Sequence, residues 1–202
     1  MQEPISDEEP LGSGFADAVQ QSQQIFRQVL DAMARPGTKQ EIPAMPYAPA
    51  PLNAASTAIV LTLLDESTPV WLDEAADNDT VRTFIAFHCG CPIVADPGEA
   101  SFALIAGALP SLDRFNQGND EFPEDSSTLI VQVETVSAGT DLFLAGPGIE
   151  DENGISDPGL PDSFWEEWAE MDTLLPCGVD LVLTADHSLT CLPRSVRRVE
   201  RA

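Results

Sequence analysis

The chain has 202 residues, 43% of them hydrophobic, and its 34 acidic and nine basic residues give a formal net charge of −25. This composition provides enough hydrophobic residues for a buried core. The acidic excess excludes a surface that binds nucleic acids or anionic membranes, because binding to phosphates needs a basic patch. The chain contains no apolar run near the roughly 20 residues that span a bilayer and no secretory signal, so we expect a cytoplasmic protein.

The first predicted element is a long helix behind an acidic tail. Residues 1–14 are acidic and interrupted by glycine and proline, so we expect them to be disordered, and we expect residues 15–202 to form a single α/β domain. A helical period starts at Phe15 and stops at Arg35-Pro36-Gly37. The residues expected to share its buried face are Phe15, Val19, Phe26, Val29, Leu30 and Met33.

The middle of the chain alternates strands and helices. A short strand is expected over 39–43, followed by an irregular proline-rich stretch. Asn53 is a suitable N-cap for a helix that is apolar on most sides and therefore buried. A strand over 69–72 leads to a helix capped by Asp77 or Asn78 that runs to His88. Strands over 92–95 and 102–106 and a short helix over 109–115 follow.

The last third of the chain predicts two hairpins around a helix. Residues 128–136 alternate as a strand and turn at 137–139 into a strand over 141–146. A long acidic loop over 147–161 precedes a helix capped by Asp162 or Ser163, and residues 179–186 and 189–196 form the final hairpin. Because helices and strands interleave, the pattern predicts one mixed β-sheet covered by helices.

The stretch His88-Cys89-Gly90-Cys91 is the one place where metal-binding or nucleophilic side chains cluster. A C-x-C pair without a second pair is too tight for structural zinc, so no metal site is predicted. Neighbouring residues on a helix point about 100° apart, which prevents His88 from easily activating Cys89, although a partner such as His187 from elsewhere in the fold stays open. The simplest interpretation treats all four cysteines as free thiols.

Other enzyme signatures are missing. The sequence has no G-x-S-x-G elbow and no phosphate-binding G-x-x-x-x-G-K-[ST] loop. Pyridoxal phosphate chemistry needs a lysine, and the single lysine, Lys39, follows a Pro-Gly turn. The sequence therefore predicts no catalytic residue and no cofactor.

Several motifs together, in a fixed order, resemble one family. They are FRQVLDAMARPG (26–37), PLN (51–53), LTLLDESTPVWL (61–72), TLIVQVETVSAG (128–139), LAGPGI (144–149), PCGVDLVLT (176–184) and Pro193-Arg194. Between them stand Asn78-Asp79 and Phe87-His88. Over residues 20–198 the chain thus resembles the H subunit of the bacterial carbon–phosphorus lyase core complex.

The resemblance carries expectations about fold, partners and function. It implies a fold similar to the large domain of type I pyridoxal-phosphate transferases, but without the cofactor site. It implies G, I and J subunits as partners, and a homodimer when the chain is isolated. The expected function is that of a non-catalytic or accessory subunit in phosphonate utilisation. The complex forms ribose 1-phosphonate 5-triphosphate from ATP and an alkylphosphonate, ahead of C–P bond cleavage.

The resemblance also suggests residues that contact a ligand at a subunit junction. These candidates are His88, Arg27, Arg35, Asn53 and Arg194. Trp165 and Trp168 are candidate interface anchors, with burial in the core as the alternative. For Arg27 the alternative is a helical ion pair with Asp31, and for His88 it is a structural role.

Two other functions stay open. One is a free-standing small-anion or nucleotide-binding protein that uses Arg194 and the basic C-terminal tail. The other is a free-standing enzyme that pairs His88 with a buried thiol. The first predicts that the isolated chain binds a ligand, and the second that it has activity without metal.

Overall fold

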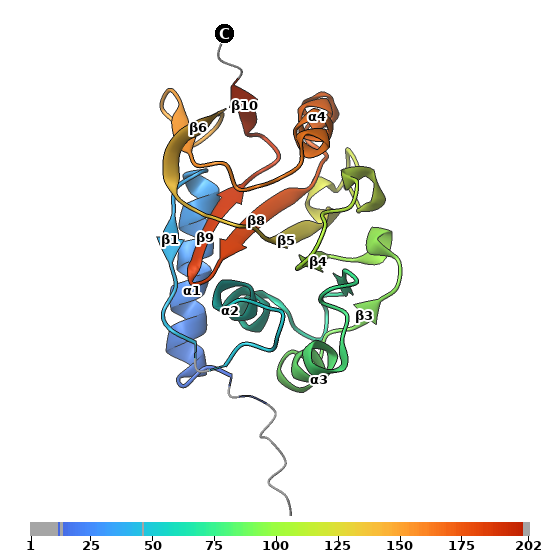
Figure 1. Cartoon of the computed structure of the whole chain (residues 1–202). Coiled ribbons are helices and arrows are strands. Elements are labelled where there is room, and N and C mark those ends of the chain that lie inside the picture. The colour runs from blue at the N-terminus through green and yellow to red at the C-terminus, as the bar shows by residue number, and fades with distance from the viewer. Residues whose placement is uncertain (1–11, 13, 46, 200–202) are drawn as a thin grey trace, which may run out of the picture.

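A computed structural model describes residue 12 and residues 14–45 and 47–199 (Figure 1). The predicted disordered tail therefore lies almost wholly outside the described residues. Within the described part of the chain, no helix is long and apolar enough to cross a membrane.

A seven-stranded mixed sheet forms the centre of the fold (Figure 1). Its spatial order is β1 (Gln40–Glu41), β9 (Ser188–Leu192), β8 (Asp180–Ala185), β5 (Thr128–Gln132), β4 (Phe102–Ile105), β2 (Val70–Leu72) and β3 (Ile93–Val94). The five strands from β8 to β3 are parallel, whereas β9 runs antiparallel to both of its neighbours. This confirms the predicted mixed sheet and the C-terminal hairpin.

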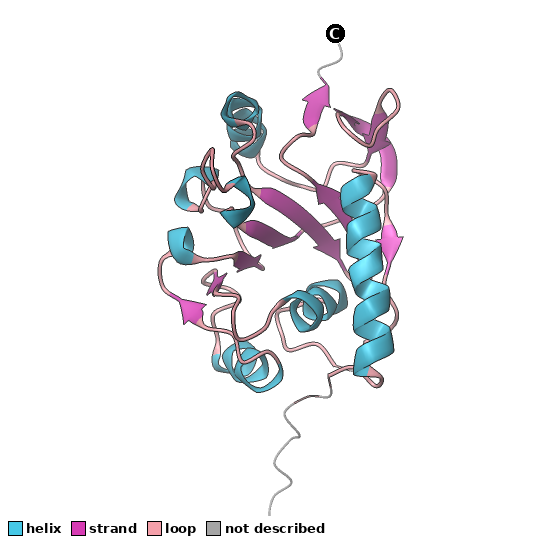
Figure 2. Cartoon of the chain, turned by 180° about the vertical axis from the view of Figure 1, so that it is seen from behind, coloured by secondary structure: helices cyan, strands magenta, loops and turns pink. Residues whose placement is uncertain are grey.

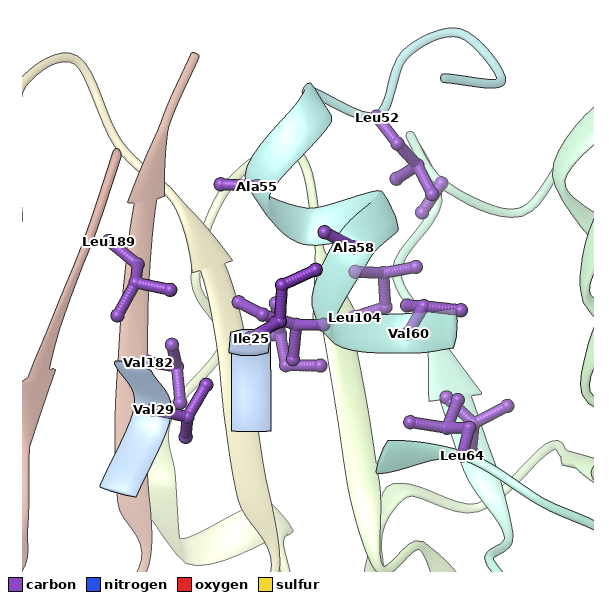
Figure 3. Close-up of a cluster of buried hydrophobic side chains, with 14 of the residues drawn as sticks. Ile25, Val29, Leu52, Ala55, Ala58, Val60, Leu64, Leu104, Val182 and Leu189 are labelled. Carbon is purple, nitrogen blue, oxygen red and sulfur yellow. The ribbon is translucent and has the colours of Figure 1, made fainter. Parts of the chain in front are cut away.

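Helices cover both faces of the sheet because its central strands are apolar on both sides. Successive side chains point to opposite faces, so Leu104, Ile130 and Val182 lie in one core cluster and their sequence neighbours in another. The first cluster lies under α1 (Ala18–Ala34), α2 (Ala54–Leu63) and α3 (Asp79–His88), and the second under α4 (Asp162–Met171). Figure 3 labels the heart of the first cluster, with Ile25, Val29, Ala55, Ala58, Val60, Leu104, Val182 and Leu189.

The starts of α2 and α3 follow the local sequence as expected, whereas α4 begins after Pro161 without a side-chain cap, so the predicted cap by Asp162 or Ser163 is wrong. Asn53 caps α2 by accepting a hydrogen bond from the Ser56 amide, and Asn78 caps α3 in the same way through Val81. Helix α2 is buried on most sides, as its apolar sequence predicts. Residues 109–115, in contrast, contain only the 3₁₀ turn η2 (Leu112–Arg114) instead of the longer helix expected there.

The predicted hairpin between residues 128–136 and 141–146 is wrong. Both edges of β5 are occupied by parallel partners, β4 and β8, so the following strand cannot pair with it. That strand, β6 (Ala138–Ala145), instead forms a separate antiparallel sheet between β10 (Arg197–Val199) and β7 (Asn153–Ile155). The segment 147–161, expected to be a loop, thus contributes a strand.

Candidate functional site

The outer side of α1 carries apolar side chains that the chain leaves uncovered. Val19, Phe26 and Leu30 are 79%, 46% and 51% exposed, and their spacing of seven and four residues places them on one side of the helix. The helix packs on α2 and β9 through a different stripe, which contains Ile25 and Val29. The prediction that Val19, Phe26 and Leu30 are buried is therefore wrong, and we call these three residues the α1 outer face.

Exposed apolar side chains gathered on one side of a helix can mark an interaction site. The sequence did contain a signal for it, because α1 has more apolar positions than a single core-facing stripe can hold. Figure 2 shows α1 running along the outside of the molecule, beside the sheet edge formed by β1 and β9. The helix is therefore accessible along its length to a partner molecule.

A polar groove of about 740 Å³ runs beside this helix. Arg27 and Gln28 lie in it, together with Gln40 of β1. The Gln28 side-chain amide donates a hydrogen bond to the Glu41 carbonyl at 2.7 Å, and so covers part of an edge strand that would otherwise be open. The Oε1 atom of Gln28 is buried without a hydrogen-bond donor among the described residues.

The two arginines of α1 have different surroundings. The Asp31 carboxylate pairs with Arg35 and also accepts a hydrogen bond from the Gln40 amide at 2.8 Å. The alternative ion pair between Arg27 and Asp31 is therefore not formed. Arg27 is exposed in the groove and makes no ion pair within the described part of the chain. Of the two, only Arg27 is available to an external anion.

Arg194, one of the sequence candidates for anion contact, is fully used inside the fold. Nε and one Nη2 hydrogen reach the two oxygens of Asp180 at 3.2 and 2.6 Å, and the other Nη2 hydrogen reaches the Ser126 hydroxyl at 2.5 Å. Nη1 donates to the carbonyls of Pro123 and Pro176 at 2.8 and 3.2 Å. A guanidinium has five N–H donors, so none is left for a ligand.

Asn53 lies at the opposite edge of the sheet, where the parallel strands end. Its Nδ2 donates to the carbonyl and the hydroxyl of Thr184, both at 3.3 Å, and its Oδ1 accepts from Ser56. Ligands of open α/β sheets bind at this carboxyl edge, and a recess of about 500 Å³ lies there between Leu109, Val133 and Leu160. Asn53 is already satisfied within the chain and does not line that recess.

His88 ends α3, as predicted, and its ring contacts Phe84 and Phe87 at centroid distances of 4.4 and 4.9 Å. Its Nε2 lies 3.1 Å from the Gly12 carbonyl oxygen. Burial, and then the neighbouring Cys91, raise the pKa of Cys89 to about 12, so this thiol is protonated at neutral pH. A protonated thiol is a poor nucleophile, which argues against the His–thiol enzyme.

Cys91 and Cys191 are not activated as nucleophiles either. Burial raises the pKa of Cys91 and of Cys191 above the ordinary thiol value. No group of three metal-ligating side chains occurs anywhere in the described ranges. Lys39 directly precedes β1 and forms an exposed ion pair with Glu41 at 2.9 Å.

The two candidate interface tryptophans belong to the second core cluster. Trp165 is 7% and Trp168 3% exposed, and the Trp168 indole N–H donates to the Val196 carbonyl at 2.8 Å. The Arg198 guanidinium lies 5.5 Å from the centre of the Trp165 ring. This burial matches the alternative in which both indoles fill the core.

The predicted ligand-contact residues are not brought together. Arg194 binds Asp180 at the beginning of β8, whereas Asn53 binds Thr184 near the end of that strand. Arg27 and Arg35 lie on α1, and His88 lies at the end of α3. The surface that stands out is the α1 outer face with its adjoining groove.

Comparison of the sequence with known proteins places the chain in a family. The sequence model of the bacterial phosphonate metabolism proteins (PhnH) matches residues 13–199. The chain is 41% identical over 185 residues to alpha-D-ribose 1-methylphosphonate 5-triphosphate synthase subunit PhnH of Rhizobium meliloti, covering 91% of this chain and 92% of the relative. It is 30% identical over 182 residues to putative C-P lyase subunit protein HtxG of Stutzerimonas stutzeri, covering 86% and 83%. The chain belongs to the PhnH family of bacterial phosphonate metabolism proteins.

Proposed function

We propose that this chain is an accessory subunit of the carbon–phosphorus lyase core complex, with no complete active site of its own. The observation that carries the proposal is the family match over nearly the whole described chain, together with a 41% identical relative that is named as a synthase subunit. In this function the complex converts ATP and an alkylphosphonate into ribose 1-phosphonate 5-triphosphate before the C–P bond is cleaved.

The partners in this proposal are the G, I and J subunits, and the α1 outer face is the docking surface. Phe26 and Leu30 support this assignment, since both are about half exposed on a helix that buries Ile25, Val29 and Ala32 in the core. Both also lie inside the FRQVLDAMARPG motif. Phe87, which is 63% exposed on α3, gives a comparison surface elsewhere on the chain.

The remaining parts of the proposal concern the isolated chain. We expect it to be a cytoplasmic homodimer, and to share its fold with the large domain of type I pyridoxal-phosphate transferases without holding that cofactor. The mixed seven-stranded sheet between two helical layers supports the likeness. Lys39 supports the lack of a cofactor, because its ammonium group is held in an exposed ion pair with Glu41 on edge strand β1, which β9 separates from the parallel strands.

Co-expression of the tagged chain with the G, I and J subunits tests the proposal. Size exclusion with mass detection, at low and high salt, should show stoichiometric co-elution. The double variant Phe26→Ser/Leu30→Ser should lose co-elution while Phe87→Ser keeps it, because interface anchors each contribute about 2 kcal/mol or more. Both side chains are half exposed, so the fold should lose little stability.

The outcomes separate the parts of the proposal. If the wild-type chain elutes alone at every salt concentration, the subunit function is refuted. If the double variant co-elutes as well as the wild type, the α1 outer face is not the docking surface. The mass of the isolated chain, measured for wild type and double variant, reports whether the same face holds a homodimer.

A second candidate function, small-anion or nucleotide binding by the free chain, has a specific location. Arg197 and Arg198 line a groove of about 430 Å³ beside Trp165, and neither forms an ion pair within the described residues. Asp162 and Glu166 line the same groove and offset the positive charge. Calorimetric titration of the isolated chain with ATP or a phosphonate tests this function, and Arg198→Ala should abolish any binding seen.

A further inference from the structure

We propose that a surface at the amino edge of the sheet docks a basic polypeptide segment, and that an arginine or lysine of this segment enters a small acidic pocket. The proposal deepens the proposed function, on which it rests, because it gives the chemistry of one partner contact. We call the surface the amino-edge patch; it consists of Phe122, Leu174 and Leu175 with the pocket beside Leu174.

The apolar part of the patch comes from two loops that precede parallel strands. Phe122, Leu174 and Leu175 are 47%, 48% and 43% exposed. The two loops meet at Arg194, whose Nη1 donates to the carbonyls of Pro123 and Pro176. In Figure 1, the yellow-green segment that leads into β5 lies close to α4. The patch is therefore a pre-organised surface, since the arginine ties both loops together.

The pocket beside Leu174 has a volume of about 260 Å³, which is smaller than the roughly 300–1,000 Å³ of small-molecule sites and suits a single side chain. Its apolar walls are Leu112, Met171 and Leu174, and its acidic lining is Asp113, Glu167 and Glu170. Long basic side chains bury their methylene stems against apolar walls while the charged head stays at the rim.

Several hydrogen-bond acceptors of this pocket lack a donor among the described residues. The Gln117 amide must point its nitrogen at the Leu112 carbonyl, 2.6 Å away, because a carbonyl can only accept. That leaves the buried Gln117 Oε1 with no donor within the described residues. The Glu167 carboxylate binds the Leu112 amide and the Ser111 hydroxyl, whereas Glu170 and Asp113 have no side-chain partner in the described part of the chain.

The charge around the patch selects a cationic partner. The segments 109–127 and 167–178 hold eight carboxylates and one arginine, Arg114, which stacks on Trp71 at 5.8 Å. The carboxylates are Asp113, Asp120, Glu121, Glu124, Asp125, Glu167, Glu170 and Asp172. An acidic rim around an apolar centre is complementary to a segment in which basic and apolar residues alternate.

Charge reversal at the pocket tests the proposal within the complex. Glu170→Lys should weaken co-elution with the G, I and J subunits about tenfold and reduce its salt dependence. Glu74→Lys makes the same charge change in an exposed turn at the opposite, carboxyl edge of the sheet and should change affinity less than twofold. Equal co-elution of both variants would overturn the inference and leave the proposed function standing.

A peptide probe tests the same surface without the other subunits. A fluorescent peptide of alternating leucine and arginine is titrated into the isolated chain in about 0.5 M salt, which screens non-specific attraction to the −25 charge. We expect Glu170→Lys and Leu174→Ser each to weaken its binding about tenfold relative to Glu74→Lys. If the two pocket variants bind the peptide as tightly as this control, the inference fails, whatever the co-elution shows.

Discussion

Loss of the Arg194 guanidinium should be one of the most destabilising single changes in the chain. In Arg194→Met the apolar stem stays, but Asp180 keeps only the backbone amide of residue 194 as a donor, at 2.8 Å. The Ser126 hydroxyl and the carbonyls of Pro123 and Pro176 also lose their donor. The variant therefore leaves the Asp180 carboxylate without its counter-ion. It also removes the hydrogen bonds through which the arginine joins the two loops.

The magnitude follows from burial. Breaking a fully buried ion pair costs about 3–5 kcal/mol. The Arg194 and Asp180 side chains are 16% and 22% exposed, so water compensates part of the loss and we expect about 3 kcal/mol. For a chain of 202 residues this lowers the melting temperature by about 6–12 °C. The exposed pair Arg35–Asp31, at 61% and 36% exposure, should contribute only about 0.3–0.5 kcal/mol.

Urea unfolding, followed by far-UV circular dichroism, measures these free energies. Arg194→Met, Asp180→Asn and the double variant form a cycle, in which we expect a coupling of about 2 kcal/mol, and Arg35→Met is the matched control. A loss below about 1 kcal/mol for Arg194→Met, or no coupling with Asp180, would refute the structural role. It would also return Arg194 to the ligand-contact candidates.

Three further predictions concern the other candidate residues. Trp168→Ala should lower the free energy of unfolding of the isolated chain by about 3–5 kcal/mol, because the buried indole also donates to the Val196 carbonyl. If urea unfolding is unchanged and only partner binding is weakened, Trp168 is not a core residue. Asn53→Ala should cost about 1–2 kcal/mol in urea unfolding through the lost cap, and no change in unfolding would mean that the cap is dispensable. Cys89 should resist iodoacetamide at pH 8, as judged by peptide mass spectrometry, while the unfolded chain reacts. The pKa of Cys89 in the folded chain is raised to about 12, so the unfolded chain loses the thiol proton at a lower pH. This difference should lower the free energy of unfolding as the pH rises from about 9 towards 12.

Much of the fold follows from the local sequence. The asparagines at 53 and 78 cap helices because their side chains satisfy a free amide at the first turn, an effect that needs no tertiary partner. The apolar sequence of α2 likewise predicts burial on most sides, because it offers no polar face to solvent. The lack of catalytic motifs and the ordered family motifs likewise needed no structure to detect.

Tertiary structure decided which residues are buried and which strands pair where the sequence allows more than one arrangement. The α1 helix has two apolar stripes, and only packing against α2 and β9 selects Ile25 and Val29 over Phe26 and Leu30. Strand β6 could not pair with β5, because both edges of β5 are taken by distant strands. Arg194 looks like an anion-binding residue in sequence, yet the five hydrogen bonds of its guanidinium reach four residues on two separate segments, 123–126 and 176–180. Non-local contacts of this kind leave no period or motif in the sequence, so only the folded chain reveals them.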